Sequence, residues 1–206
     1  MNLSNSEDDR VKDILEAIEE LLSDKEKVII AIDGRCASGK TTLARKIQMA
    51  YSHPSQILHM DDFYMPLNRR KTNWEQEIAG NMDFERFISQ ALLPAYQNKE
   101  IVYQPFSCQK KTLLESTLLE PCDLTIVEGS YAMHNSLCQY YDLMIFLTCN
   151  QEVQRNRIIE REKERYIQFE QRWIPMEEAY FKALNVAERC QLKYDTSNIS
   201  NNEIRR

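Results

Sequence analysis

The sequence predicts an α/β fold, in which a mostly parallel sheet is covered by helices on both faces. Short apolar segments alternate along the chain with segments of helical periodicity, and this alternation is typical of parallel sheets. The first apolar segment, residues 28–32, contains no polar residue, as expected of a strand buried on both faces. A chain of 206 residues is long enough for one such domain and short for two.

The elements follow from local patterns. Residues 7–22 repeat apolar side chains at helical spacing and place acids on the opposite face, which predicts an amphipathic helix within an N-terminal segment, residues 1–24. Pro94 is expected to kink or end the helix that contains it. Further helices are expected at residues 42–51, 83–97, 151–164 and 176–190, further strands at 57–60, 124–127 and 143–147, an edge strand at 192–194, and a polar tail at 195–206.

Charge and composition exclude several classes of function. The net charge is −6, whereas nucleic-acid-binding domains usually carry a basic excess, so no nucleic-acid partner is expected. No apolar run approaches the ~20 residues of a membrane span. The acidic start of the chain does not resemble a signal peptide, and the six cysteines form no C-x-x-C pair, so we expect reduced thiols and a cytoplasmic location.

Residues 34–41 match the phosphate-binding pattern G-x-x-x-x-G-K-[ST] without deviation. With Thr42, the predicted nucleotide-binding set is Gly34, Arg35, Cys36, Ala37, Ser38, Gly39, Lys40, Thr41 and Thr42. The glycines let successive backbone N–H groups face one anion, and Lys40 is expected to reach the β- and γ-phosphates. The Thr41 hydroxyl is placed to bind Mg²⁺. A chance match arises in roughly one chain in a hundred, but here the motif also lies between a predicted strand and a predicted helix. We therefore expect ATP and Mg²⁺ as cofactors.

Acidic residues end two of the predicted strands. Glu128 follows the strand at residues 124–127 and is a candidate ligand of Mg²⁺ or of its water, although a solvated acid would look the same. Asp61 and Asp62 follow the strand at 57–60. An acceptor hydroxyl needs a carboxylate that orients it and takes its proton, so one of this pair is a candidate catalytic base. The alternative is that the pair caps the following turn.

These motifs occur in the same order as in the uridine kinase and phosphoribulokinase family, which the chain resembles over about residues 28–190. The resemblance rests on the phosphate loop, on Asp61-Asp62-Phe63-Tyr64, on Asn81-Met82-Asp83, on residues 103–110 and on Val127-Glu128-Gly129. It implies a P-loop kinase fold, nucleoside- or nucleotide-kinase-like with three layers, in a single domain over residues 1–206. It also implies transfer of the γ-phosphoryl group of ATP to a hydroxyl, with Asp61 as the catalytic carboxylate. Asp83 and Tyr103 match the family's sugar-binding acid and base-pocket tyrosine.

An arginine-rich helix follows the last of these motifs. Arg157, Arg161 and Arg165 are spaced by four residues and therefore lie near one helix face. The resemblance implies that this helix leads into a lid, about residues 155–176, whose arginines neutralise the transferred phosphoryl group. Arg157 and Arg161 best match the family spacing and are the predicted catalytic arginines. The alternative is a solvated face on which glutamates pair with the arginines.

Two departures from the family concern the phosphoryl acceptor. Cys108 stands where the nucleoside kinases carry a histidine, and Lys110 where they carry an arginine. Cysteine is a poor hydrogen-bonding partner for a pyrimidine base, which predicts poor use of uridine. The expected partner is thus a small molecule with a hydroxyl group, either a nucleoside or another alcohol such as pantothenate, glycerate or a sugar derivative. A nucleotide-binding regulatory protein without turnover is the remaining alternative, and the first helix could pack on its own domain or join a homo-oligomer.

Overall fold

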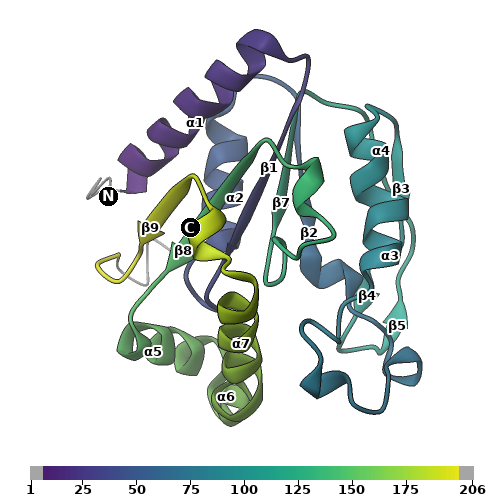
Figure 1. Ribbon diagram of the computed structural model, residues 1–206, viewed down its shortest axis with the longest axis vertical. Helices are drawn as coiled ribbons and strands as arrows, with labels where there is room; N and C mark the ends of the chain where they lie inside the picture. The colour runs from purple at the N-terminus through teal and green to yellow at the C-terminus, as the bar shows by residue number, and fades with distance from the viewer. Residues whose placement is uncertain (1–6, 200–206) are drawn as a thin grey trace.

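The computed structural model describes residues 7–199; the rest of the predicted N-terminal segment and polar tail, residues 1–6 and 200–206, lie outside the described residues. Five parallel strands form the central sheet, in the order β2-β7-β1-β8-β9 (Figure 1). They are β1 (Val28–Gly34), β2 (Ser55–His59), β7 (Leu124–Glu128), β8 (Leu143–Thr148) and β9 (Leu192–Asp195). All five strands were predicted from the sequence, including the edge strand, and their alternation with helices confirms the α/β class.

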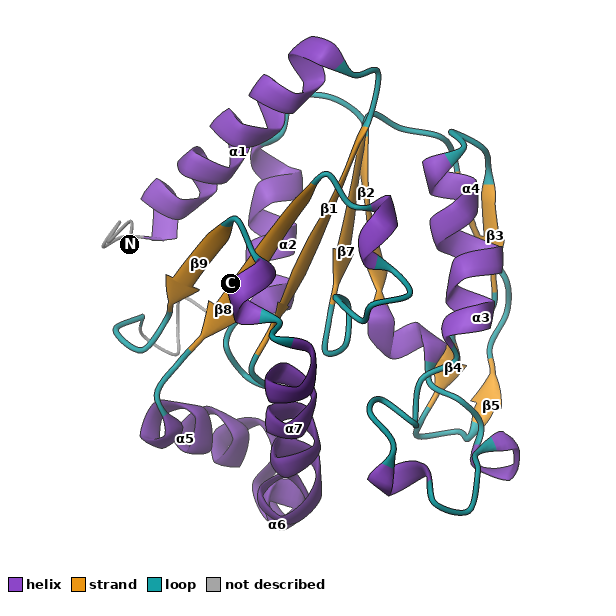
Figure 2. Ribbon diagram, viewed as in Figure 1, coloured by secondary structure: helices purple, strands orange, loops and turns teal. Residues whose placement is uncertain are grey.

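The helices lie on both faces of this sheet (Figure 2). They are α1 (Glu7–Asp24), α2 (Lys40–Ala50), α3 (Phe84–Phe87), α4 (Leu93–Tyr96), α5 (Gln151–Glu162), α6 (Tyr166–Gln168) and α7 (Ile174–Leu184). Within residues 7–199, no helix is long and apolar enough to cross a membrane. The last predicted helix, at 176–190, instead spans 174–184 and is followed by a separate 3₁₀ turn, because Asn185 adopts a left-handed conformation that ends α7.

Pro94 does not end the helix that contains it. Between α3 and α4 the chain forms a π-helical turn, Ile88–Leu92, closed by a bond from the Leu93 N–H to the Ile88 carbonyl. Proline lacks the N–H that an α-helix needs at this position, and the wider turn lets the helical path continue. The predicted single helix at 83–97 is therefore three consecutive helical segments.

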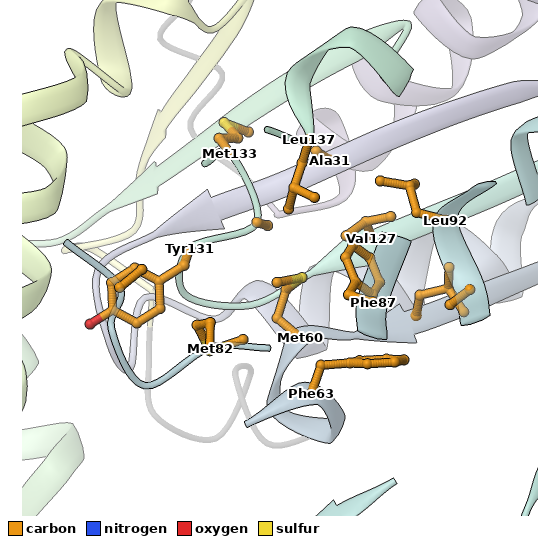
Figure 3. Packing of buried hydrophobic residues seen from close by; sticks show 14 of the residues in the cluster. Ala31, Met60, Phe63, Met82, Phe87, Leu92, Val127, Tyr131, Met133 and Leu137 are labelled. Atoms are coloured by element: carbon orange, nitrogen blue, oxygen red, sulfur yellow. The ribbon is translucent and has the colours of Figure 1, made fainter. Parts of the chain in front are cut away.

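Strand β1 separates two hydrophobic clusters. Val28, Ile30 and Ile32 belong to a cluster with α1 and α2. Ile29 and Ala31 belong to a second cluster on the other face, whose packing is shown in Figure 3. Every residue of β1 is buried, as the uninterrupted apolar run predicted.

Two small antiparallel sheets were not predicted. Strand β3 (Ile101–Tyr103) pairs with β6 (Thr117–Leu119), and β4 (Phe106–Ser107) pairs with β5 (Thr112–Leu113). Strands of two or three residues are too short to show an alternating pattern, so the sequence carries no periodic signal for them. They place residues 103–113 beside the carboxyl ends of the central strands.

The carboxylate of Asp33, in β1, is fully buried and joins three parts of the chain. It accepts hydrogen bonds from the backbone N–H of Gly34 at 2.7 Å and of Met133 at 2.9 Å, and from the Tyr180 hydroxyl at 2.7 Å. Burial raises the pKa of Asp33, while the Tyr180 bond and the charge of Lys40 oppose that shift. The three donors are thus what makes a carboxylate tolerable in the interior.

Tyr180→Phe should lower the free energy of unfolding by about 1.5–3 kcal/mol, the range for a hydrogen bond to a charged group. Tyr194→Phe is the matched control, because the Tyr194 hydroxyl is also buried but has no hydrogen-bond partner within residues 7–199. Urea denaturation at neutral pH should show the loss in the first variant and little change or a gain in the second. Equal losses would show that the Tyr180–Asp33 bond contributes nothing specific.

Candidate functional site

A cavity of about 970 Å³ lies at the carboxyl ends of the central strands, where parallel α/β sheets bind their ligands. In Figure 1 this end of the sheet faces the region between α5–α7 on one side and β4 and β5 on the other. The walls come from the phosphate loop, from the segments after β2 and β7, from residues 106–111, and from the segment 157–177. The cavity therefore brings together motifs that lie far apart in the sequence.

The phosphate loop connects β1 directly to α2. A side chain at Gly34, where φ is +140°, would place its Cβ 1.9 Å from the Leu147 carbonyl oxygen, so only glycine fits between the two strands. Gly39 adopts φ 97° as the residue that precedes α2. The positive N-terminal end of α2 thus faces the cavity together with Lys40, Thr41 and Thr42.

The Lys40 side chain is mostly buried and is held against the loop. Its Nζ donates to the carbonyl oxygens of Gly34 at 2.7 Å and Arg35 at 3.0 Å. Burial lowers the pKa of Lys40, but the negative charge of Glu177 and other acids outweighs this, so the pKa is raised overall. Lys40 is therefore a fixed positive charge at neutral pH.

Thr41, Glu128 and His59 form a contiguous polar group in the structure. The Thr41 hydroxyl lies 3.0 Å from both carboxylate oxygens of Glu128, and Nδ1 of His59 lies 2.6 Å from Oε1 of Glu128. The bond to Glu128 raises the pKa of His59. A hydroxyl and a carboxylate are the oxygen ligands that Mg²⁺ prefers, so these residues fit the predicted metal site.

The contact of His59 with Glu128 was not predicted from the sequence. The two residues pair directly in the register of β2 and β7. Knowledge of that strand order would have revealed the contact. Among residues 7–199 no group of three or more His, Cys, Asp or Glu side chains could hold a metal ion.

Asp61 and Asp62 lie in a 3₁₀ turn, Met60–Phe63, directly after β2. Asp61 lines the cavity and accepts a hydrogen bond from the Tyr64 hydroxyl at 3.1 Å. The surrounding walls remove part of its hydration and raise its pKa, and repulsion from Glu128 raises it further. Asp62 is not part of the cavity wall and accepts from the Tyr103 hydroxyl at 3.0 Å. The geometry supports Asp61 as the candidate base.

Asp83 and Tyr103, the predicted acceptor-binding residues, do not line the cavity. The Asp83 carboxylate is buried, accepts from the backbone N–H of Arg86, and lies 3.4 Å from NH1 of Arg69. Tyr103 is buried and stacks on Phe63. Their contact with an acceptor stays a prediction.

The two predicted catalytic arginines occupy different surroundings. Arg157 is buried and donates to the carbonyl oxygens of Ala37, Thr196 and Ile199, so it joins the phosphate loop to the end of the described chain. Both arginines line the cavity, but the Arg161 guanidinium binds no backbone carbonyl of residues 7–199: its NH2 is 3.3 Å from Sγ of Cys36 and its Nε is 3.0 Å from Glu162. Arg161 is thus placed to meet a phosphate group, whereas Arg157 supports the loop that would bind it; both catalytic roles stay predictions.

Helix α7 clamps the phosphate loop through two glutamates that the sequence analysis missed. The buried Glu177 accepts from the Cys36 N–H and the Ser130 hydroxyl, both at 2.7 Å. Glu178 forms a two-point ion pair with the Arg35 guanidinium, at 2.6 and 3.2 Å. In an amphipathic helix these acids look like a solvated face, so no sequence signal distinguishes them.

The family model described as the phosphoribulokinase/uridine kinase family matches residues 29–168. The chain belongs to this family. The matched segment runs from β1 to α6 and contains the phosphate loop, Asp61 and Glu128. The resemblance drawn from the motifs is therefore confirmed.

Curated relatives and solved structures agree with this assignment. A uridine kinase of Limosilactobacillus reuteri is 26% identical over 147 residues, which cover 67% of this chain and 66% of that protein, just under two thirds of its length. A uridine kinase of Ligilactobacillus salivarius is 29% identical over 147 residues, covering 66% of this chain and 67% of that protein.

Two solved structures share the fold. A possible uridine kinase from Bacillus stearothermophilus superposes with a TM-score of 0.69 at 18% identity, covering 91% of this chain and 98% of that chain. A D-glycerate 3-kinase from Cryptococcus neoformans gives a TM-score of 0.59 at 12% identity, covering 84% and 87%. These likenesses establish the P-loop kinase fold.

Asp61→Asn should lower kcat by about 10²-fold or more, the usual contribution of a positioned base, with little change in the KM for ATP. Asp62→Asn should have the smaller effect, because its carboxylate faces Tyr103 rather than the cavity. Steady-state kinetics of both folded variants measure this. A larger effect of Asp62→Asn than of Asp61→Asn would show that Asp62 is the base. Weakened ATP binding at unchanged kcat would show that Asp61 belongs to the metal site instead.

Proposed function

We propose that this protein is an ATP-dependent kinase, similar to uridine kinases, that transfers the γ-phosphoryl group to a hydroxyl of a small molecule. The observation that carries the proposal is the shared cavity: the phosphate loop, the Thr41–Glu128 pair and the Asp61 carboxylate all line it. Phosphoryl transfer requires little beyond positioning and charge neutralisation around the transferred group. These three elements supply both.

The nucleotide end of the cavity would hold the phosphates of ATP. Backbone N–H groups of the loop and the start of α2 favour negative charge, and Lys40 adds a fixed positive charge. Thr41 and Glu128 would hold Mg²⁺, which when bound neutralises charge on the β- and γ-phosphates. Arg161, which lines the same cavity beside Cys36 of the loop, is placed to stabilise the charge that develops during transfer.

The acceptor would lie on the Asp61 side of the cavity. Asp61, when ionised, orients the acceptor hydroxyl and takes its proton as the bond to phosphorus forms. The Tyr64 hydroxyl donates to the same carboxylate at 3.1 Å and fixes its orientation. Because a base must be ionised to accept a proton, and the pKa of Asp61 is raised, turnover should fall as the pH drops through that pKa.

The identity of the acceptor is a separate matter. Curated relatives named uridine kinase support a nucleoside. Cys108, on the cavity wall, supports a non-nucleoside alcohol, because a thiol is a weak partner for a base. A regulatory protein without turnover is disfavoured by the presence of Lys40, Thr41, Asp61 and Glu128 in one cavity.

Uridine and cytidine should be phosphorylated poorly compared with the best non-nucleoside alcohol in a panel that also contains pantothenate, glycerate and pentose derivatives. A site in which Cys108 replaces the family's base-pocket histidine lacks one polar partner for the base and should discriminate less strongly in its favour. The measurement is kcat/KM for each compound at fixed ATP and Mg²⁺. Lys40→Ala serves as the control for true turnover and should lose at least ~10²-fold.

Two outcomes would contradict parts of this proposal. If kcat/KM for uridine is much higher than for every other compound, Cys108 does not mark a changed acceptor pocket. The protein would then be a uridine kinase. Failure of every compound to accept a phosphoryl group, with ATP still bound, would leave a nucleotide-binding protein without turnover.

A further inference from the structure

One arginine that lines the cavity, Arg70, lies outside the phosphate loop and has no role in the phosphoryl transfer proposed above. Arg70 lines the cavity with Tyr64, Leu67 and Cys108. The charged or titratable groups that act on it are Cys108, Arg172 and Tyr64; none of them belongs to the phosphate loop. Arg70 therefore belongs to the acceptor end.

Arg70, Cys108 and the candidate base Asp61 line the same cavity. The Tyr64 hydroxyl donates to Asp61 at 3.1 Å, and the next residue, Met65, accepts from Nε of Arg70 at 2.8 Å. The segment 61–70 therefore presents Asp61 and Arg70 to one cavity. A small molecule whose hydroxyl lies at Asp61 would bring its other end toward Arg70.

The guanidinium of Arg70 is held in place by the protein. Its Nε donates to the Met65 carbonyl at 2.8 Å, and its Cζ lies over the Trp74 ring, 4.5 Å from the ring centre. Met65 is itself fixed, because its N–H donates to the Asn81 carbonyl at 2.8 Å. An arginine that is stacked and bonded through Nε loses little freedom when its two terminal nitrogens bind a ligand.

Those terminal nitrogens have no hydrogen bond or ion pair to any residue that the structure describes. Burial lowers the pKa of Arg70, and repulsion from Arg172 lowers it further. Arg172 also lies over Trp74, at 4.7 Å, and its own acidic partner is Glu75. Two arginines thus share one ring, and only one of them has a carboxylate partner.

The remaining charges at this end reinforce the imbalance. Lys111 and Arg172 line the cavity with Arg70; over the whole lining, seven basic side chains face five carboxylates, of which Asp61 is the one that comes from residues 61–111. Asn81 also lines the cavity, and both polar atoms of its buried side-chain amide lack a partner within residues 7–199. Unsatisfied buried polar groups and an unpaired guanidinium in one wall are typical of a binding site.

We propose that the phosphoryl acceptor carries an anionic group, a carboxylate or a phosphate, and that Arg70 binds this group through its two terminal nitrogens. The fork of a guanidinium matches the oxygens of either anion. The inference rests on the proposed kinase function and narrows its acceptor to hydroxy acids and phosphorylated or otherwise anionic alcohols. Arg70 is a specificity residue and takes no part in proton or phosphoryl transfer.

The test compares acceptors that differ only in charge: glycerate with glycerol, pantothenate with pantothenol, and ribose 5-phosphate with ribose. In the wild-type protein the anionic member of at least one pair should have the higher kcat/KM, by about 10- to 100-fold, as expected for a charge-assisted hydrogen-bond pair. Arg70→Gln should remove this preference, mainly by raising the KM of the anionic acceptor. Arg70→Lys, which keeps the charge but loses the fork, should fall between the two.

Lys71→Gln is the matched control. Lys71 is adjacent to Arg70 in sequence and exposed, forms an ion pair with Glu77 at 3.0 Å, and is not part of the cavity wall. It should leave the preference unchanged, and none of the three variants should alter the KM for ATP. Thermal melting confirms that each variant is folded.

Calorimetry with Mg²⁺ and a non-hydrolysable ATP analogue separates the two proposals. If anionic compounds bind in an Arg70-dependent manner but none is phosphorylated, the inference stands and the kinase function fails. If a neutral member or uridine is phosphorylated as well as the anionic compounds, the kinase function stands and the inference is overturned. The inference is also overturned if no anionic compound binds, or if Arg70→Gln leaves the preference intact.

Discussion

The burial of one carboxylate, that of Asp33, is the constraint on which the site depends. Asp33 is the residue of β1 directly before the phosphate loop, and its three donors come from the loop itself, from the segment after β7 and from α7. An ionised group inside the protein is costly unless such donors surround it. When all three donors bind the Asp33 carboxylate, they therefore fix the loop, the segment after β7 and α7 relative to one another.

This junction fixes the phosphate loop before any ligand arrives. The loop is bound by α7 through Glu177 and Glu178, and by α5 through Arg157, which reaches the Ala37 carbonyl. Electrostatic catalysis depends on groups that are already oriented when charge develops. A loop held by two helices and by the end of β1 meets that requirement. Arg161 and the segment after α5 line the same cavity.

The elements that could be predicted from the sequence are those with a long apolar run or a fixed spacing. The strand before Gly34 and the strand at residues 124–127 were recognised because burial imposes their apolar composition. The pairing of His59 with Glu128 was not, since it depends on which strands are neighbours. Glu177 and Arg70 were missed for a related reason: an acid on a helix and an arginine in a loop are usually solvated, and only the packed structure shows what surrounds them.

A crystal structure with Mg²⁺, a non-hydrolysable ATP analogue and an acceptor tests most directly the claim that one cavity joins the nucleotide to Asp61. The proposed site predicts that the γ-phosphate lies beside Lys40, that the metal contacts the Thr41 hydroxyl, and that the acceptor hydroxyl lies within hydrogen-bonding distance of Asp61 and in line with the γ-phosphorus. An acceptor bound elsewhere, or a γ-phosphate directed away from Asp61, would contradict the claim.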